Sequence, residues 1–466
     1  MYILWSFDTE DYITPEADDA LLSWARLLSR RDVRGSFCLV AEKARALRRR
    51  DRTDVLFALR PHEIGYHSNW HSRPPVFSVY LDACGWEDGL AAVLEREEAG
   101  VADVEAITGK RPVCDVPPGK SWAPQVIAAM KEMGIPISAG AYVCDPHRIP
   151  TSYCGALTLR YGMAMETFID LENPLRAAQE RFVAMAETAD SDHGVIVPFS
   201  HPAMAVTKVF WDAVNFAEGR NPAPEAWLPA PLRPAEQTDF FFNYVEEFLD
   251  WLLREPGLEW INYEDLLARY PLGRPVEVTL DTVLDASDRI LRRLGPVDLG
   301  EDTLSAAEVL AALVETYLGA DPQGKLPVRV TLTSPLGPAV APPEETAAGE
   351  LAMHDLLPAL RVFAAGLAHD RPMPHELVVG GCRLSPGDLV NTLAEGLSGW
   401  AARGHIPERL PLRRGPPYPS LPEMEAAWKP FQVKGTWPIF PPDFEGRNVA
   451  EMGRRMLWSY RLLKRR

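Results

Sequence analysis

The chain has 466 residues, which is too long for one ordinary domain and predicts two or three. Its 47% apolar and 24% charged residues are typical of a globular protein, and no apolar run approaches the roughly 20 residues that cross a bilayer. The formal net charge of −17 argues against nucleic acid and anionic membranes as main partners.

The start of the chain and its cysteines bear on the cell compartment. Residues 1–8 lack the basic and small-residue regions of a signal peptide and read as a strand. The six cysteines are scattered without a CxxC pair, which is ordinary usage for a reduced chain of this length. We therefore predict a cytoplasmic protein.

Strands and helices alternate along the first 270 residues. We expect strands at 2–7, 35–40, 63–67, 135–139, 195–199 and 258–261, and helices at 15–31, 41–59, 87–107, 123–133, 175–187 and 238–253. This alternation predicts βα units around a parallel sheet or barrel. In such folds chemistry gathers where the strands end. Asp8, His67 and His201 all fall at predicted strand ends.

The pattern changes after residue 270. Three helix-like runs each lead through a loop to an apolar–Pro pair and an extended segment. The runs cover 304–318, 353–367 and 384–397, and the extended segments 326–330, 373–379 and 406–410. We interpret residues 271–412 as a smaller, mainly helical domain with a degenerate helix–strand repeat. Residues 413–466 are interpreted as an extended arm rich in proline and aromatics, with a helix at 448–463. These modules are compatible with oligomerisation, which charge and composition do not show.

Two histidines four residues apart, His67 and His71, follow the third predicted strand. If the chain turns helically after Tyr66, both imidazoles lie on one face and reach one ion. Histidine is the commonest metal ligand, so the pair indicates a metal site that lacks only a carboxylate and water. His62, at the start of the same strand, is interpreted as structural.

Several motifs occur in a recognisable order along this first region. They are Ser6-Phe7-Asp8 with its following acids, Gly35-Ser36-Phe37, His67-Ser68-Asn69-Trp70-His71, the strand from Ile196 to His201, and Leu258-Glu259-Trp260-Ile261. In these motifs the sequence resembles the polysaccharide deacetylases, the carbohydrate esterases built on the NodB homology domain. The resemblance covers roughly residues 1–270. It implies an α/β fold with a distorted (β/α) barrel and a metal-dependent hydrolase of amide bonds.

The resemblance also implies roles for single residues. His67, His71 and one carboxylate would hold a divalent metal ion, expected to be Zn²⁺, which lowers the pKa of water and polarises an acyl oxygen. Asp8 would be the base that takes the proton of the water, and His201 the acid that protonates the departing nitrogen.

The carboxylate ligand is open between two residues. In the family's usual motif the metal-binding Asp follows the base directly, but Thr9 stands there. Glu10 shares the side of Asp8 if the strand stays extended, because side chains alternate with period two. Asp11 reaches the ion only if the chain turns. We favour Glu10 and keep Asp11 as the alternative.

The family's Arg-Pro-Pro motif, whose arginine steadies the base, is irregular in this chain. Val116 stands where the arginine is expected and cannot orient a carboxylate, although Lys120 is close enough in sequence to supply a charge. Pro118 and Gly119 of this segment are expected to contact substrate, and Trp122 to form an apolar wall or part of the core. Asp145 is a candidate to replace part of the lost network.

These motifs lead to one main functional prediction and two rivals. We predict a metal-dependent deacetylase or amidohydrolase that acts on an N-acetylated amino sugar or related small acetamide. One rival is a metal-free amidohydrolase of the same fold, which the intact histidine pair disfavours. The other is a catalytically inactive carbohydrate-binding protein, for which Val116 is the best support.

Overall fold

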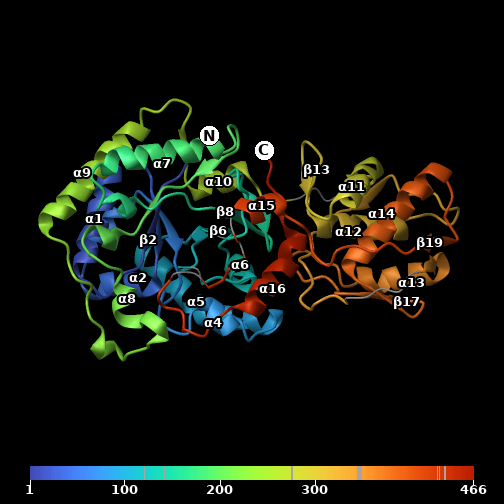
Figure 1. The fold of residues 1–466 in the computed structure, drawn as a ribbon, viewed down its shortest axis with the longest axis horizontal. Helices are drawn as coiled ribbons and strands as arrows, with labels where there is room; N and C mark the ends of the chain where they lie inside the picture. The colour runs from blue at the N-terminus through green and yellow to red at the C-terminus, as the bar shows by residue number, and fades with distance from the viewer. Residues whose placement is uncertain are drawn as a thin grey trace. The chain divides into compact units, whose positions relative to one another are not determined.

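The computed structural model describes residues 1–465 apart from 120, 141, 274–276, 344–348, 428, 430 and 435–436. Its residues form two compact units (Figure 1). The first unit comprises Met1–Pro150, Ala156–Tyr270 and Lys429–Ala450, and the second comprises Thr151–Gly155, Pro271–Trp428 and Glu451–Arg466. No helix among the described residues is long and apolar enough to cross a membrane.

A parallel sheet forms the centre of the first unit. Its strands are ordered β10 (Phe199–Ser200), β2 (Ser6–Thr9), β3 (Ser36–Leu39), β4 (Glu63–Tyr66), β5 (Cys114–Asp115), β6 (Ile137–Ala139) and β8 (Ala156–Leu159). Three further strands form a smaller parallel sheet in the order β11 (Glu259–Trp260), β1 (Tyr2–Ile3) and β9 (Val195–Ile196). Its middle strand, β1, directly precedes β2 in the chain. The mixed α/β fold predicted from the alternation is confirmed.

The chain that follows β8 closes this sheet against β10. Ala164 pairs with Phe199 in a parallel bridge, and the Phe199 N–H donates to the Met163 carbonyl at 2.9 Å. The Gly162 N–H donates to the Val197 carbonyl at 2.7 Å, and a Cβ at Gly162 would lie only 2.7 Å from that oxygen. Glycine therefore permits the close approach at this seam. The result is an irregular, closed barrel.

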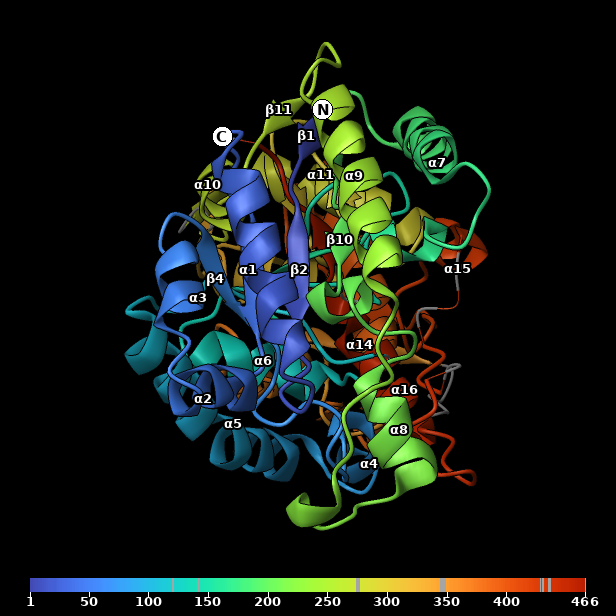
Figure 2. The ribbon, with the colours of Figure 1, turned by 90° about the vertical axis from the view of Figure 1, so that its left-hand side faces the viewer.

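Helices cover the outside of the barrel. They are α1 (Glu16–Ser29), α2 (Ala41–Arg49), α3 (Thr53–Ala58), α4 (Phe77–Leu81), α5 (Trp86–Thr108), α6 (Pro124–Glu132), α7 (Pro174–Thr188), α8 (Trp211–Phe216), α9 (Ala235–Leu252) and α10 (Tyr263–Arg269). Figure 2 shows α1 and α9 on either side of β2. Trp24 of α1 contacts Phe241 of α9 at 5.8 Å and Trp5 at 5.7 Å, so these two helices share one aromatic core with the first strand.

Two elements differ from the sequence prediction for local reasons. The single helix expected over 41–59 is wrong: Asp51 takes a left-handed φ of 53° between α2 and α3. The Arg52 N–H then donates to the Leu47 carbonyl at 2.9 Å, which ends the first helix. The strand expected over 195–199 is split into β9 and β10 at Pro198, which has no N–H to donate to a ladder.

The second unit contains two copies of one supersecondary motif. The first copy is β12 (Glu277–Thr279), α11 (Leu280–Arg292), the hairpin β13–β14 (Val297–Asp298, Thr303–Leu304), α12 (Ala306–Leu318) and β15 (Arg329–Thr331). The second copy is β16 (Glu350–Ala352), α13 (Met353–Ala364), the hairpin β17–β18 (Leu377–Val379, Cys382–Leu384), α14 (Pro386–Arg403) and β19 (Arg409–Pro411). In each copy the first and last strands pair antiparallel.

This arrangement corrects the predicted triple repeat of a helix and an extended segment. The repeating piece is strand–helix–hairpin–helix–strand and occurs twice, because the extended segment after each first helix pairs within its own hairpin. The second helix of each copy begins at a serine capping box, Ser305 with Glu308 and Ser385 with Asp388. The helices of both copies pack on one apolar core.

The described part of the arm and C-terminus is divided between the units. It contains the short helix α15 (Pro422–Ala427), a segment without regular structure, and α16 (Arg447–Met456). The helix expected over 448–463 is too long, because a 3-10 turn, Leu457–Ser459, follows α16 and leads to β20 (Arg461–Leu462). β20 pairs antiparallel with β7 (Thr151–Tyr153) within the second unit. Trp428, which the sequence placed in the arm, lies outside the described residues.

Candidate metal and proton-transfer site

Two carboxylates, Asp8 and Glu10, lie on the same side of the chain at the end of β2. Asp8 lies in β2, and Glu10 follows it by two residues, so alternation puts both side chains on one side. Both are buried, with Asp8 at 6% and Glu10 at 4% exposure.

The two histidines follow β4 in a loop and not in the helix that was expected. Ser68 and His71 have left-handed φ angles of 67° and 53°. The His71 N–H donates to Ser68 Oγ at 2.8 Å, so the serine hydroxyl fixes a tight turn between the two histidines. The helical expectation was wrong, but the turn still brings the ring centroids of His67 and His71 to 4.7 Å.

Glu10, His67 and His71 form a buried group, which we call the ligand cluster. Glu10 Oε2 lies 2.8 Å from His71 Nε2 and 3.6 Å from His67 Nε2. One ligand atom from each residue lies within 4.8 Å of the other two. Burial alone raises the pKa of Glu10, but the positive charges that His71 and His201 carry when protonated bring it well below its usual value.

Both imidazoles of the ligand cluster are oriented through their other nitrogen. His67 Nδ1–H donates to the Val116 carbonyl at 2.7 Å. His71 Nδ1–H donates to Ser72 Oγ, and the Ser72 hydroxyl donates to Asp212 Oδ2 at 2.7 Å. Because Nδ1 carries the proton in each ring, Nε2 presents a lone pair toward Glu10.

Each residue of the ligand cluster has a buried polar atom that lacks a hydrogen-bond partner among the described residues. Among the described residues, Glu10 Oε1, His67 Nε2 and His71 Nε2 are buried without a donor or acceptor. Buried polar atoms left in this state are costly, and a cation removes that cost. Two imidazole nitrogens and one carboxylate suit Zn²⁺ with a position left open, so these residues fit a divalent metal ion.

Asp11 is outside the ligand cluster, which corrects its place as an alternative ligand. Its Oδ1 accepts from the N–H groups of Ile13 and Thr14 at 2.9 and 2.8 Å, so the carboxylate closes the turn after the first strand. Burial, opposed by the charge of Lys43, raises the pKa of Asp11 to about 6. Lys43 Nζ donates to the Asp11 carbonyl at 2.6 Å and to Asp18 at 2.5 Å.

Asp8 and His201, which we call the proton-transfer pair, face each other with 3.6 Å between Asp8 Oδ2 and His201 Nε2. Tyr161 Oη–H donates to Asp8 Oδ1 at 2.9 Å, which leaves Oδ2 toward the histidine. His201 Nδ1–H donates to Glu166 Oε1. Burial alone lowers the pKa of His201, but the charges of Glu166, Glu10 and Asp8 raise it to about 10. His201 is therefore a cation at neutral pH.

Sequence reasoning missed four of the residues that orient this site: Ser72, Tyr161, Glu166 and Asp212. Tyr161 follows β8, and Glu166 lies in a 3-10 turn, Met165–Phe168, before α7. Asp212 lies in α8 and is 2% exposed. None has a motif spacing that marks it. The only sequence signal was a carboxylate, Asp212, among buried aromatics.

The segment with the irregular motif supports the site through its backbone. The Val116 carbonyl accepts the proton of His67, a role that any residue type can fill. Pro118 is buried, and the Gly119 carbonyl accepts from Tyr142 Oη–H at 2.6 Å. Trp122 is 2% exposed and packs on Tyr142 at 6.0 Å, which fits its reading as part of the core. Lys120 lies outside the described residues.

Two other predicted positions have structural contacts. Asp145 Oδ1 accepts from the His147 N–H at 2.8 Å and from the Ile149 N–H at 3.4 Å, so it caps its own loop. His62 Nδ1 accepts from the Gly35 N–H at 3.2 Å, and its Nε2–H donates to the Ala25 carbonyl at 2.9 Å. Burial lowers the pKa of His62 to about 4, as expected for a neutral structural histidine.

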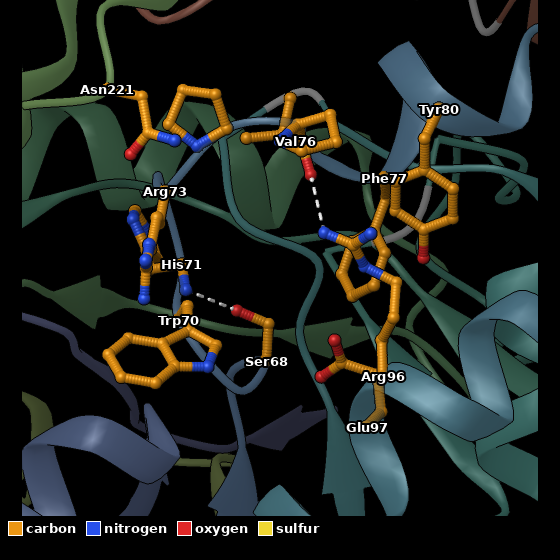
Figure 3. Close-up of a pocket in the computed structure, with 12 residues that line it drawn as sticks. Ser68, Trp70, His71, Arg73, Val76, Phe77, Tyr80, Arg96, Glu97 and Asn221 are labelled. Atoms are coloured by element: carbon orange, nitrogen blue, oxygen red, sulfur yellow. Dashed lines mark hydrogen bonds between the residues drawn. The ribbon is translucent and has the colours of Figure 1, made fainter.

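A cavity of about 270 Å³ lies next to the histidine loop (Figure 3). Arg73 stacks over Trp70 at 4.8 Å, and Arg96 stacks over Tyr80 at 4.5 Å, which gives the cavity a cationic and aromatic lining. Ser68, Trp70 and His71 of the turn are among its lining residues (Figure 3). Asp8 and Glu10 do not line this cavity, so it is not the space between the acid and the base.

Comparisons with known proteins gave no sequence-level match. A scan against protein-family models and a search of curated proteins found none. The search of solved structures found a probable polysaccharide deacetylase from Pseudomonas aeruginosa PAO1, at 13% identity and a TM-score of 0.38 over 57% of this chain and 89% of that one. The polysaccharide deacetylases are the family that the sequence motifs resemble.

Two further solved structures differ in activity. A 4-alpha-glucanotransferase from Thermococcus litoralis matches at 12% identity and a TM-score of 0.39, over 58% of this chain and 40% of that one. A CE4 family pseudoenzyme from Bacillus anthracis matches at 11% identity and a TM-score of 0.31, over 57% of this chain and 65% of that one. These two matches span less than two thirds of the neighbours' chains. At such identities and TM-scores, the reaction has to be inferred from the site itself.

Proposed function

We propose that this chain is a metal-dependent hydrolase of carbon–nitrogen amide bonds that removes the acyl group from an N-acetylated amino sugar or a related small acetamide. The observation that carries the proposal is the ligand cluster, in which the Nε2 atoms of His71 and His67 lie 2.8 and 3.6 Å from Glu10 Oε2 and have no hydrogen-bond partners among the described residues. The proton-transfer pair lies beside it: Asp8 and Glu10 each add to the charge that keeps His201 protonated.

The chemistry divides between the ion and the protein. When bound, a divalent ion lowers the pKa of water and polarises the acyl oxygen. Glu10, His67 and His71 would hold it, because Val116 and Ser72 accept from the Nδ1–H of the two rings and so keep both Nε2 lone pairs directed at it. Glu10, His67 and His71 are buried, which keeps bulk water away from their ligand atoms. In such a water-excluded site the attraction between a bound cation and the acyl oxygen would be stronger than in water.

The protein moves two protons. Asp8 Oδ2 is the acceptor for the proton of the attacking water, because Tyr161 occupies Oδ1. His201 Nε2–H donates its proton to the departing nitrogen as the C–N bond breaks, and Glu166 holds the imidazolium through Nδ1. A water is thus added across the amide, which yields a carboxylic acid and an amine.

The acyl group and the sugar of this proposal suit the aromatic side chains around His201. Phe210 packs edge-on to the His201 ring at 4.9 Å, and Phe199 lies 5.6 Å from it. Aromatic faces pack well against the apolar face of a sugar or an acetyl methyl group. The family resemblance of the motifs points to the same class of substrate.

The proposal is tested by acetate release from N-acetylglucosamine oligomers and small acetamides. We expect release by the metal-replete chain, its loss on chelation and its return with added Zn²⁺ or Co²⁺. Release that is unchanged by exhaustive chelation would favour the metal-free rival. A chain that binds the ion and the sugar but releases no acetate would favour the inactive binding protein, for which Val116 in place of the arginine remains the supporting observation.

A further inference from the structure

A tryptophan from far along the chain lies against the ligand cluster. Trp437 belongs to the segment Lys429–Ala450, which forms part of the first unit although some 160 residues of the other unit separate it from the barrel sequence. Its ring packs edge-on to His71, with 5.8 Å between centroids and an interplanar angle of 85°. Its Nε1–H donates to Asp212 Oδ2 at 3.0 Å.

The described part of this segment is fixed to the barrel at several points. The Pro438 carbonyl accepts from the Glu218 N–H at 2.7 Å, and Asn448 donates from its backbone N–H to Asp82 Oδ1 at 2.8 Å. A Cβ at Gly119 would lie 2.4 Å from the Trp437 ring, so the indole fills the space that this glycine leaves. Trp437 is therefore held in a defined position.

The hydrogen bond from Trp437 joins the relay that orients His71. Asp212 Oδ2 accepts from both Ser72 Oγ–H and Trp437 Nε1–H, while Asp212 Oδ1 is buried without a partner among the described residues. Because the described residues offer this carboxylate no other hydrogen-bond donor, the indole N–H is one of the two contacts that set its orientation. Ser72 in turn accepts the proton of His71 Nδ1. Outer partners of this kind set the orientation and basicity of a metal ligand.

We propose that Trp437 is a positioning residue of the metal site, and that the C-terminal segment completes the site by supplying it. The inference rests on the proposed function, since it assigns a role toward the ion held by the ligand cluster. Trp437 acts through Asp212 and Ser72 on His71 and does not itself bind the ion. A chain without the indole N–H then holds the ion more weakly, while the barrel remains folded.

The experiment measures Zn²⁺ affinity of the full chain by competition with a chromophoric chelator. Trp437→Phe keeps an aromatic ring and removes only the N–H donor, and we expect about 10-fold weaker binding, in the range typical of outer partners. Phe444→Leu is the matched control, because Phe444 lies in the same segment and stacks on Phe440 at 5.2 Å without a contact to Asp212. Its affinity is expected to equal that of the wild type.

A double-mutant cycle separates positioning from a general loss of structure. Asp212→Ala alone should weaken binding, and adding Trp437→Phe to it should weaken binding no further, because the indole N–H then has no acceptor at this position. Additive losses would overturn the inference, as would wild-type affinity in Trp437→Phe. If Trp437→Phe does not fold, Asp212→Ala and Ser72→Ala still test the relay, and wild-type affinity in both overturns it. A wild-type chain that binds no ion would instead overturn the proposed function, and this inference with it.

Discussion

The two halves of the site differ in how their polar atoms are paired. In the ligand cluster, Glu10 Oε1 and the Nε2 atoms of both histidines have no hydrogen-bond partner among the described residues. In the proton-transfer pair, Asp8 accepts from Tyr161, and His201 donates to Glu166. The ligand cluster and Asp8 are buried, and the side chain of His201 is 16% exposed.

This difference in pairing distinguishes the residues that would bind the ion from the residues that transfer protons. Buried lone pairs directed at one point require a cation, and two of the three are held there by hydrogen bonds on the far nitrogen of the ring. Groups that exchange protons instead need neighbours that set their charge, and the neighbouring carboxylates do so for His201. The same buried pocket therefore supplies two chemistries by two kinds of pairing.

The largest effect is expected when the base, Asp8, is removed and the ligand cluster is left intact. Asp8→Asn is expected to lower kcat for acetate release by about 10³-fold, because a general base typically contributes about 10²- to 10⁴-fold. Metal content, measured by mass spectrometry, should stay at the wild-type level. Asp239→Asn, on the exposed face of α9, is the control with unchanged kcat. Wild-type kcat in Asp8→Asn would contradict the assignment of the base.

The ligand cluster is tested by two neighbouring acids. Glu10→Gln is expected to weaken Zn²⁺ binding by about 100-fold or more, beyond the effect of an outer partner. Asp11→Asn should bind normally, since asparagine still accepts from the Ile13 and Thr14 N–H groups. Equilibrium dialysis against a Zn²⁺ buffer series measures both. The reverse ranking of these variants would make Asp11 the ligand.

A buried lysine, Lys43, supports the segment that carries Glu10. Lys43 and Asp18 are each 1% exposed and joined at 2.5 Å, and Lys43 also holds the Asp11 carbonyl next to Glu10. Lys43→Met leaves Asp18 with Arg50, at 3.1 Å, as its nearest cation and is expected to lower the unfolding free energy by about 1–3 kcal/mol. Urea unfolding followed by tryptophan fluorescence measures the loss. The exposed Lys208→Met serves as control, and equal stability of the two variants would show that the buried pair is unimportant.

The roles assigned to the proton-transfer pair can be tested by the pH dependence of kcat. Because His201 acts as the acid, activity falls as pH rises through its pKa, which Glu166 helps to raise to about 10. Glu166→Gln removes one negative charge, so the basic limb of the kcat profile should move to lower pH by about one unit. The acid limb should not move. A basic limb at the wild-type position would show that His201 is not the proton donor.

The sequence predicted the parts of the site that lie in motifs and missed those brought in by tertiary contact. Alternation along an extended strand was enough to favour Glu10, and the His67–His71 spacing was enough to find both imidazoles. The turn between them was mispredicted because a side-chain bond from Ser68 competes with helix formation. The alternation of strands and helices expected from the sequence also described most of the barrel.

The remaining site residues could not be found from local patterns. Tyr161 and Glu166 reach the proton-transfer pair across 153 and 35 residues of chain, and Trp437 reaches Asp212 across 225. The partner of His67 is the backbone carbonyl of Val116, which leaves no trace in residue type. The twofold motif of the second unit was misread as threefold for a related reason, since hairpin and terminal strands look alike in sequence.

The most direct test of the account is X-ray absorption at the zinc edge on the full chain loaded with one equivalent of Zn²⁺. The account predicts nitrogen and oxygen ligands at about 2.0–2.1 Å with an imidazole scattering pattern for two histidines. That pattern should weaken to one histidine in His67→Ala. Sulfur ligands, or a spectrum identical in wild type and His67→Ala, would contradict the claim that Glu10, His67 and His71 hold the ion.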